Sequence, residues 1–392
     1  MNINILSMRI PEFNELAKII EGARDLGVEV VELGITEEGR PVYGMYFGRG
    51  KARLAIVSSQ HGSEPAPALA SIIFTYRALR NELRIKRSEL LAKYRIMVVP
   101  IANPDGLSKL RKCLEECKAP DWRCECVEAR FTSLLEDPNR DWLLLKNKPI
   151  QAIHKAINEF DPHIVLDLHE FYAKGGAPPK WAHETEGFDA YVTDTPYLGV
   201  SPEIMTLSAE LALRVRNAIE SSSGWKTRIL RPGNGVAAYP PIYLGTHAPF
   251  EGCAKLLVET WGVGLGNYLL YERVSIHLEA IITALDLMND IEFLEYVKRM
   301  DKKYDEMIGR EASAKYIVKG EDLDKAKELL SKHKIKYKLA GSELCVELPQ
   351  RYSRITLFLL DKDYYVNKIL ARKGSLVTID KFLNVDIIKK KS

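Results

Sequence analysis

Four short, mainly apolar runs constrain the fold of this chain most strongly. They are residues 52–59, 95–100, 163–168 and 255–260. Strands that are buried on both faces of a sheet have this composition, whereas strands with one wet face alternate polar and apolar residues. Stretches with helical character alternate with these runs, at residues 65–83, 149–160, 203–221 and 267–300. The order predicts an α/β fold with a mostly parallel or mixed sheet and helices on both faces.

The remaining segments suggest how the chain is divided. Residues 12–25 have an amphipathic pattern typical of a helix, and residues 28–34 and 42–48 form a predicted hairpin. Two irregular stretches, 107–136 and 172–202, are expected to be long loops. After residue 300 the chain becomes rich in Lys and shows short β-α-β-β signals. We therefore expect a large domain at 1–300 and a small α+β domain at 301–392.

The overall composition excludes several classes of partner. Hydrophobic residues make up 46% of the chain, and the net charge is only +3. This balance gives no reason to expect a nucleic-acid partner. We find no apolar run of 18 residues and no signal-peptide pattern, so no membrane association is expected and the predicted location is cytoplasmic. The oligomeric state is not indicated.

Polar side chains follow the predicted strands at the points where they end. His61 and Glu64 come after the first buried run, His169 ends the third, and Glu259 ends the fourth. In open α/β sheets, ligands bind outside the carboxyl ends of the strands. The sequence therefore predicts that two histidines and two glutamates meet at one edge of the sheet.

This residue set suits a catalytic zinc ion. Such an ion takes three protein ligands from His and carboxylate and leaves one position for water. His61 and Glu64 are three residues apart, so one short turn presents both, and His169 completes the set. Glu259 is then free to act as the general base on water whose pKa the metal lowers.

The motifs resemble a known family when they are taken in order. The chain contains QHGSEP (60–65), NPDG (103–106), EDPNRDW (136–142), VLDLHE (165–170) and LLVETWG (256–262). This series is similar to that of the M14 zinc metallocarboxypeptidases and their succinylglutamate-desuccinylase-like relatives. The resemblance covers roughly residues 40–290 and does not extend to the last ninety residues.

The resemblance implies a role for each matching residue. His61, Glu64 and His169 would bind zinc, and Glu259 would activate water. Asn139 and Arg140 would grip the terminal carboxylate of the substrate, for which the guanidinium fork is suited. An ion pair between Arg140 and Asp141 is the structural alternative. Asp137 would accept the second ring N–H of His61 and fix its tautomer.

Three features depart from the family pattern. The family has an arginine after NPDG that stabilises the oxyanion. Four basic residues compete for this role, and Arg111 is selected because it is the arginine that lies closest to the motif; the four are Lys109, Arg111, Arg123 and Arg130. The family's mobile tyrosine corresponds to Tyr239 or Tyr243, of which we take Tyr243. The short spacing from Asn139 to His169, and Glu170 after the ligand, favour the microbial, desuccinylase-like branch.

Four cysteines lie close together, at Cys113, Cys117, Cys124 and Cys126. Their spacing fits paired zinc knuckles only in its first half. Two disulfides are the preferred interpretation, and a second, structural zinc ion or free thiols are the alternatives. A reducing cytosol disfavours disulfides except in hyperthermophiles.

The sequence thus predicts a zinc carboxypeptidase that removes C-terminal residues from peptides. The main alternative is a zinc-dependent deacylase of N-acyl amino acids, which would use the same metal, base and carboxylate clamp. A non-catalytic binding protein on the same scaffold is a third interpretation, but it would require a missing ligand or base.

Overall fold

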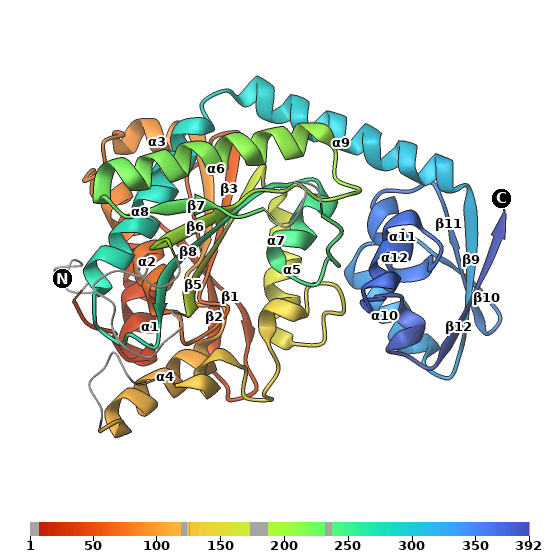
Figure 1. Ribbon diagram of the computed structural model, residues 1–392, viewed down its shortest axis with the longest axis horizontal. Coiled ribbons are helices and arrows are strands. Elements are labelled where there is room, and N and C mark those ends of the chain that lie inside the picture. Colours follow the sequence, from red (N-terminus) through yellow and green to blue (C-terminus); the bar gives the residue numbers. More distant parts are fainter. Residues whose placement is uncertain (1–7, 119–123, 125, 173–186, 232–236, 392) are drawn as a thin grey trace.

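The computed structural model describes residues 8–118, 124, 126–172, 187–231 and 237–391. The chain folds into a large α/β unit and a smaller C-terminal unit, and the long helix α9 (Ile291–Ala312) joins them (Figure 1). Because this helix runs across residue 300, the predicted boundary at 300/301 falls inside it. The second sheet begins at residue 314. We call residues 314–391 the C-terminal unit.

An eight-stranded mixed sheet forms the centre of the large unit, in the order β1-β2-β4-β3-β5-β8-β6-β7. The bounds are β1 (Glu29–Ile35), β2 (Pro41–Phe47), β3 (Ala52–Ser58), β4 (Tyr94–Val99), β5 (Ile164–Tyr172), β6 (Ala190–Thr193), β7 (Thr227–Ile229) and β8 (Ala254–Val263). The four predicted buried strands are β3, β4, β5 and β8, and they pair in parallel. The predicted hairpin is the antiparallel pair β1–β2.

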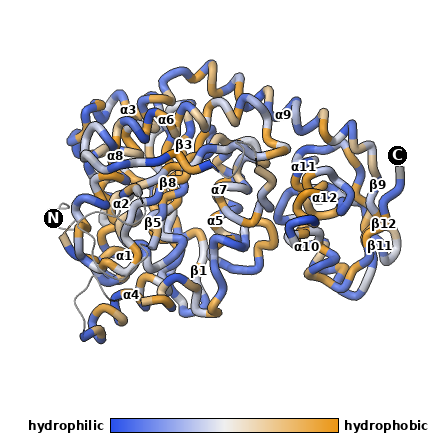
Figure 2. The backbone as a smooth tube through the Cα atoms, viewed as in Figure 1, coloured by the Kyte–Doolittle hydropathy of each residue, from blue (hydrophilic) through white to orange (hydrophobic). Residues whose placement is uncertain are grey.

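Helices cover both faces of this sheet, as predicted. Those of the large unit, apart from α9, are α1 (Phe13–Gly22), α2 (Pro65–Leu79), α3 (Arg87–Lys93), α4 (Pro104–Glu116), α5 (Lys148–Phe160), α6 (Pro202–Ser223), α7 (Leu244–His247) and α8 (Leu270–Leu287). Helices α2, α6 and α8 pack together on one face, and α5 and α7 lie on the other (Figure 1). The central strands are almost completely buried and hydrophobic (Figure 2).

One prediction about a loop was wrong. The stretch 107–136 is not one long loop, because α4 occupies its beginning. Asn103 caps this helix by accepting a hydrogen bond from the Gly106 N–H, and Pro104 is its first residue, so NPDG starts a helix rather than a loop. The stretch 267–300 is helical, as predicted, and contains α8 and the first part of α9. The predicted loop 172–202 lies partly outside the described residues, and β6 occupies part of the rest.

The C-terminal unit is α+β, with the β-α-β-β order that its sequence indicated. Its elements are β9 (Ala314–Gly320), α10 (Leu323–Lys332), β10 (Lys338–Ala340), β11 (Glu343–Glu347), α11 (Ser353–Leu360), α12 (Tyr365–Arg372) and β12 (Val385–Lys391). The four strands form an antiparallel sheet in the order β10-β11-β9-β12. Among the described residues, no helix is long and apolar enough to cross a membrane.

Candidate metal centre and active site

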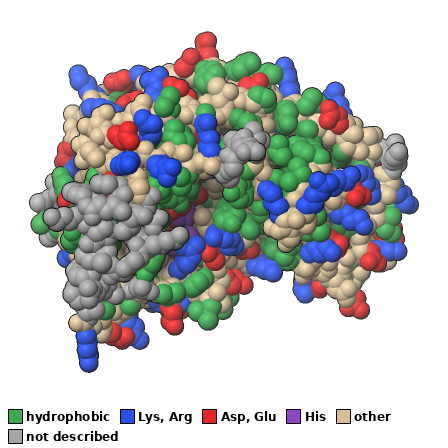
Figure 3. Space-filling view, viewed as in Figure 1, with side chains coloured by type: hydrophobic (Ala, Val, Ile, Leu, Met, Phe, Trp, Pro, Cys, Tyr) green, Lys and Arg blue, Asp and Glu red, His purple; other side chains and the backbone are tan. Residues whose placement is uncertain are grey.

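The strand order brings the predicted site residues together. β3, β5 and β8 are neighbours in the sheet, and the segment with His61 and Glu64 follows β3 directly. His169 on β5 lies opposite Glu259 on β8 in the parallel ladder. All four side chains line one cavity of about 780 Å³ at this edge of the sheet. Figure 3 shows the surface hollowed over the large sheet, with a histidine side chain visible in the hollow and basic side chains beside it.

The predicted metal ligands converge on one point. Nδ1 of His61 lies 2.6 Å from Oε1 of Glu64, and Nδ1 of His169 lies 2.7 Å from Oε2 of the same carboxylate. All three side chains are buried. Although burial favours the neutral acid, the imidazoles of His61 and His169 hold the pKa of Glu64 well below its usual range. The carboxylate is therefore ionised and ready to bind a cation.

The surroundings of these histidines fit a zinc ion. Nε2 of His61 lies 3.1 Å from Oδ1 of Asp137, and Nε2 of His169 lies 2.8 Å from Oδ1 of Asp167. A carboxylate on the far ring nitrogen fixes the tautomer that leaves Nδ1 free to bind metal. Two Nδ1 atoms and one carboxylate make up the ligand type of hydrolytic zinc sites. The predicted contact of Asp137 with His61 is thus present, and Asp167 makes the equivalent contact with His169.

A close backbone contact fixes the loop that carries His61 and Glu64. A Cβ atom at Gly62 would come within 2.0 Å of the Gly106 carbonyl carbon, so only glycine fits between this loop and the start of α4. Glu64 immediately precedes α2, whose first residue is Pro65. The QHGSEP and NPDG motifs are therefore adjacent in space, and each depends on the other for its conformation.

Glu259 stands next to the metal ligands without joining them. It receives a hydrogen bond from the Tyr191 hydroxyl on the neighbouring strand β6. Burial raises the pKa of Glu259 above its usual value, and the imidazole of His169 opposes this shift only in part. A carboxylate with a raised pKa is a stronger base, which suits proton transfer near neutral pH.

Asn139, Arg140 and Tyr243 line the same cavity, as predicted. The amide of Asn139 accepts a hydrogen bond from the Leu244 N–H and lies near His169, so its orientation is fixed. The Arg140 guanidinium stacks over the Tyr243 ring at 4.2 Å. It makes no ion pair with Asp141, whose carboxylate instead accepts from the Asn147 N–H. The side chain of Arg140 is 42% exposed, which leaves its fork accessible to a ligand.

The prediction that Arg111 lies at the active site was wrong. Arg111 lies on α4, pairs with Glu115 one turn later, and does not line the cavity. Arg130 does line it: Nη1 lies 3.4 Å from Nδ1 of His61, and Nη2 lies 2.9 Å from Oδ2 of Asp137. Lys109 donates to the Thr132 carbonyl, and Arg123 lies outside the described residues. Sequence proximity failed here because the chain turns back after α4.

The cysteine cluster forms two disulfides, Cys113–Cys126 and Cys117–Cys124. This confirms the preferred interpretation and excludes a four-cysteine zinc site. The first disulfide connects α4 to the segment just before Arg130. Closing this loop covalently reduces the conformational freedom of the segment that delivers Arg130 to the cavity.

Sequence reasoning missed several residues of the site. Gln60 and Asp167 contact His169 or its neighbours, and the alternation of the strand around DLH could have indicated Asp167. Lys255 is fully buried in the cavity wall, where burial lowers its pKa to about 8. Its ammonium donates to the carbonyls of Thr193 and Asp194, so it holds that segment against β8. A lysine inside an apolar strand was the available signal.

Comparison with known proteins agrees with these observations. The zinc carboxypeptidase (peptidase M14) family model matches residues 17–165. Carboxypeptidase 2 of Trichophyton tonsurans is 27% identical over 282 residues, covering 65% of this chain and 48% of the relative. Carboxypeptidase 2 of Trichophyton rubrum is 26% identical over 279 residues, with coverage of 65% and 48%. The chain thus spans about half the length of the curated relatives it matches.

One solved structure shows the likeness of fold. Carboxypeptidase A from Helicoverpa armigera superimposes with a TM-score of 0.50 and 16% identity, covering 72% of this chain and 74% of that one. At this level of identity the match supports the architecture alone. It agrees with the α/β fold described above.

Proposed function

We propose that this chain, which belongs to the M14 family of zinc carboxypeptidases, hydrolyses the C-terminal peptide bond of peptide substrates. One observation carries the proposal. A single cavity is lined by a zinc-type ligand set, a separate carboxylate and the partly exposed guanidinium of Arg140. These are the parts required to activate water, move a proton and hold a terminal carboxylate.

The proton transfers are assigned to Glu259. A zinc ion held by His61, Glu64 and His169 would supply a Lewis acid that polarises the scissile carbonyl and lowers the pKa of water. Glu259 takes a proton from the attacking water as the new carbon–oxygen bond forms. It then gives this proton to the peptide nitrogen as the carbon–nitrogen bond breaks. The hydrogen bond from Tyr191 keeps the carboxylate oriented between these steps.

Two arginines interact with two different negatively charged groups of the substrate. Arg140, with Asn139 beside it, binds the terminal carboxylate and so selects substrates that end in the cavity. Arg130 points at the metal ligands and would stabilise the oxyanion that develops on the scissile carbonyl. We therefore transfer the role first expected of Arg111 to Arg130.

A panel of substrates tests the proposal against its main alternative. The panel contains blocked dipeptides with a free C-terminus, the same dipeptides as C-terminal amides, and N-acetyl and N-succinyl amino acids. Cleavage of the free acids, with little cleavage of the amides, supports a carboxypeptidase. Cleavage of the acyl amino acids alone would assign the site to a deacylase of the predicted desuccinylase-like branch. No cleavage by the zinc-loaded protein would favour a binding protein.

The cellular location stays a prediction. Two disulfides require an oxidising compartment or a cytosol that tolerates them, as in hyperthermophiles. A cytoplasmic location therefore fits a cytosol that tolerates disulfides.

A further inference from the structure

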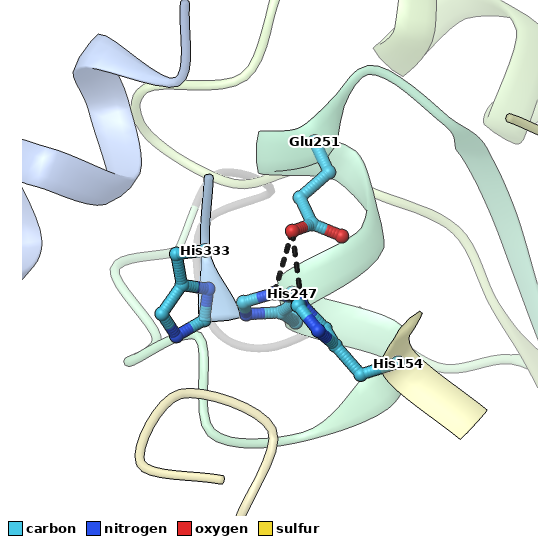
Figure 4. A group of neighbouring side chains, drawn as sticks. All are labelled: His154, His247, Glu251 and His333. Atoms are coloured by element: carbon cyan, nitrogen blue, oxygen red, sulfur yellow. Dashed lines mark hydrogen bonds and ion pairs between the residues drawn. The ribbon is translucent and has the colours of Figure 1, made fainter. Parts of the chain in front are cut away.

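A second cluster of histidines lies outside the cavity, where the C-terminal unit meets the large unit (Figure 4). His154 comes from α5, His247 ends α7, and Glu251 ends the short 3₁₀ helix Ala248–Glu251. His333 follows α10 and belongs to the C-terminal unit. Each of the three histidines is at most 2% exposed. Neither the sequence pattern nor the proposed reaction accounts for this cluster.

The distances within the cluster match the edges of a zinc tetrahedron. Nε2 of His154 lies 3.0 Å from Oε1 of Glu251, and Nε2 of His247 lies 3.2 Å from the same oxygen. The two Nε2 atoms are 3.3 Å apart. Ligand atoms at about 2.0 Å from a tetrahedral zinc ion are separated by about 3.3 Å. One potential ligand atom from each of the four residues lies within 4.8 Å of the others.

Hydrogen bonds to backbone carbonyls determine the tautomers of two of the histidines. Nδ1 of His247 lies 3.1 Å from the Pro241 carbonyl oxygen, and Nε2 of His333 lies 2.7 Å from the Leu143 carbonyl oxygen. A carbonyl only accepts, so both of these nitrogens carry hydrogen. In the neutral rings, the lone pairs of His247 Nε2 and His333 Nδ1 are then free to bind a metal, which is the usual arrangement for metal-bound histidines.

Without a metal ion, this arrangement leaves two costs unexplained. His333 Nδ1 is buried and has no hydrogen-bond partner among the described residues. In addition, because Nδ1 of His247 donates to the Pro241 carbonyl, the neutral ring presents a lone pair rather than a hydrogen to Oε1 of Glu251, 3.2 Å from its Nε2. A cation at the centre of the four residues satisfies every one of these groups.

We propose that His154, His247, Glu251 and His333 form a second zinc site, which fastens the C-terminal unit to the catalytic unit. Three imidazoles and one carboxylate fill all four positions of a tetrahedral ion, so no position remains for water and the site is structural. His333 supplies the ligand from the C-terminal unit, and the other three come from the large unit. Asn158 adds a hydrogen bond from its amide to Glu251, which steadies that ligand.

The position of the cluster also gives it a role in the active site. His247 and Glu251 follow Tyr243 by one and two helical turns, and Leu143, which accepts from His333, follows Arg140 closely. The second zinc ion would therefore fix the segment that carries Arg140 and the segment that carries Tyr243. It would act on Arg140 and Tyr243 through the backbone and would not touch the substrate.

Zinc content of single-site variants tests this proposal independently of the reaction. The full-length protein is saturated with zinc, freed of loosely bound metal and measured by mass spectrometry. We expect two zinc ions per chain in the wild type and one in His61→Ala, in which the catalytic site is disabled. His333→Gln should also hold one, and His61→Ala/His333→Gln none. His163→Gln is the matched control, because His163 is buried beside Glu295 but belongs to no group of potential metal ligands among the described residues, and it should keep two.

The result in His61→Ala decides the question even if His333→Gln does not fold. The proposal would be overturned if His61→Ala held no zinc. It would also be overturned if the zinc ion of His61→Ala were still present in His61→Ala/His333→Gln. Cobalt loaded into His61→Ala gives a second readout, since a tetrahedral site produces strong visible absorption. A chelator should lower the melting temperature of His61→Ala and leave that of His61→Ala/His333→Gln unchanged. Equal melting temperatures with and without chelator in His61→Ala would contradict a structural role.

Discussion

The indole Nε1 of Trp142 donates a hydrogen bond of 2.8 Å to the side-chain oxygen of Gln60. The amide nitrogen of Gln60 in turn lies 2.7 Å from Oδ1 of Asp167 and 3.1 Å from Nε2 of His169. On its other side, the Trp142 ring packs against His154 and His247. Trp142 therefore connects the catalytic ligands to the second histidine cluster.

Replacing Trp142 with phenylalanine should weaken zinc binding at the catalytic site. The variant keeps an aromatic ring but removes the only N–H of the side chain, so Gln60 and Asp167 are less firmly held. Loss of such an outer contact lowers metal affinity about tenfold or more. Competition with a chromophoric chelator measures this, and excess zinc should restore activity.

Trp261→Phe is the matched control for this change. Trp261 is equally buried, and its Nε1 has no hydrogen-bond partner among the described residues. It should keep the zinc affinity of the wild type. An equal loss of affinity in both variants would mean that packing, rather than the Trp142–Gln60 hydrogen bond, supports the ligands.

Changing Arg130 to methionine should lower kcat far more than changing Arg111 to methionine. Arg130→Met removes a positive charge that faces the reacting carbonyl, and kcat should fall by about 10²–10³-fold. Arg111→Met removes an exposed pair with Glu115 and should leave kcat unchanged. Steady-state kinetics on a blocked dipeptide distinguishes them. A larger effect at Arg111 would restore the assignment made from the sequence.

Arg140 should determine the preference for a free carboxylate. Losing a charge-assisted hydrogen-bonded pair costs about 1.5–3 kcal/mol, so Arg140→Ala should lower kcat/KM for free-acid substrates by about 10–150-fold. Arg140→Lys keeps the charge but not the fork, and it should recover only part of the loss. Cleavage of amide substrates should not change. If acids and amides lose equally, Arg140 is not the clamp.

His277 should make folding stability depend on pH. Burial, with Arg273 nearby, lowers the pKa of this imidazole to about 3, whereas an unfolded chain has about 6.5. The unfolded state therefore binds more protons below pH 6.5, and stability is lost as the pH falls from about 6.5 towards 3. One pKa unit corresponds to about 1.4 kcal/mol, so His277 contributes on the order of 2 kcal/mol between pH 6 and pH 4.

Urea unfolding at several pH values measures this contribution. Between pH 6 and pH 4 the free energy of unfolding should fall less in His277→Gln than in the wild type, by on the order of 2 kcal/mol. Both proteins carry the same zinc sites, so metal loss at low pH affects them equally. Identical slopes would show that His277 does not titrate as its burial implies.

Much of the fold followed from the sequence because the central strands are buried on both faces. β3, β4, β5 and β8 have no polar alternation to confuse their assignment, and their order puts His61, His169 and Glu259 at one edge. The contact between Asp137 and His61 was implied by the resemblance to the M14 zinc metallocarboxypeptidases and is present in the structure. These features depend on local sequence and on one rule of sheet topology.

The features that were missed depend on long-range contacts. Arg130 reaches the cavity only because the chain reverses after α4, a path that two disulfides hold in place. Residues 107–116 were expected to be loop because the stretch 107–136 is irregular in composition, whereas the helix α4 that they form is capped by Asn103, before that stretch begins. His247 and Glu251 are four residues apart, but His154 and His333 are remote from them in the sequence, so only tertiary folding brings the four together. No periodic pattern in the chain could have indicated that cluster.

The central claim is tested most directly by Glu259→Gln, measured for turnover and zinc content in the same preparation. The amide keeps the size of the side chain but accepts no proton, so kcat should fall by about 10²–10⁴-fold on a blocked dipeptide with a free C-terminus. Zinc content should equal that of the wild type, because Glu259 is not a ligand. Turnover at the wild-type rate would contradict the assignment of Glu259 as base, and a wild-type protein without zinc at His61, Glu64 and His169 would contradict the metal centre itself.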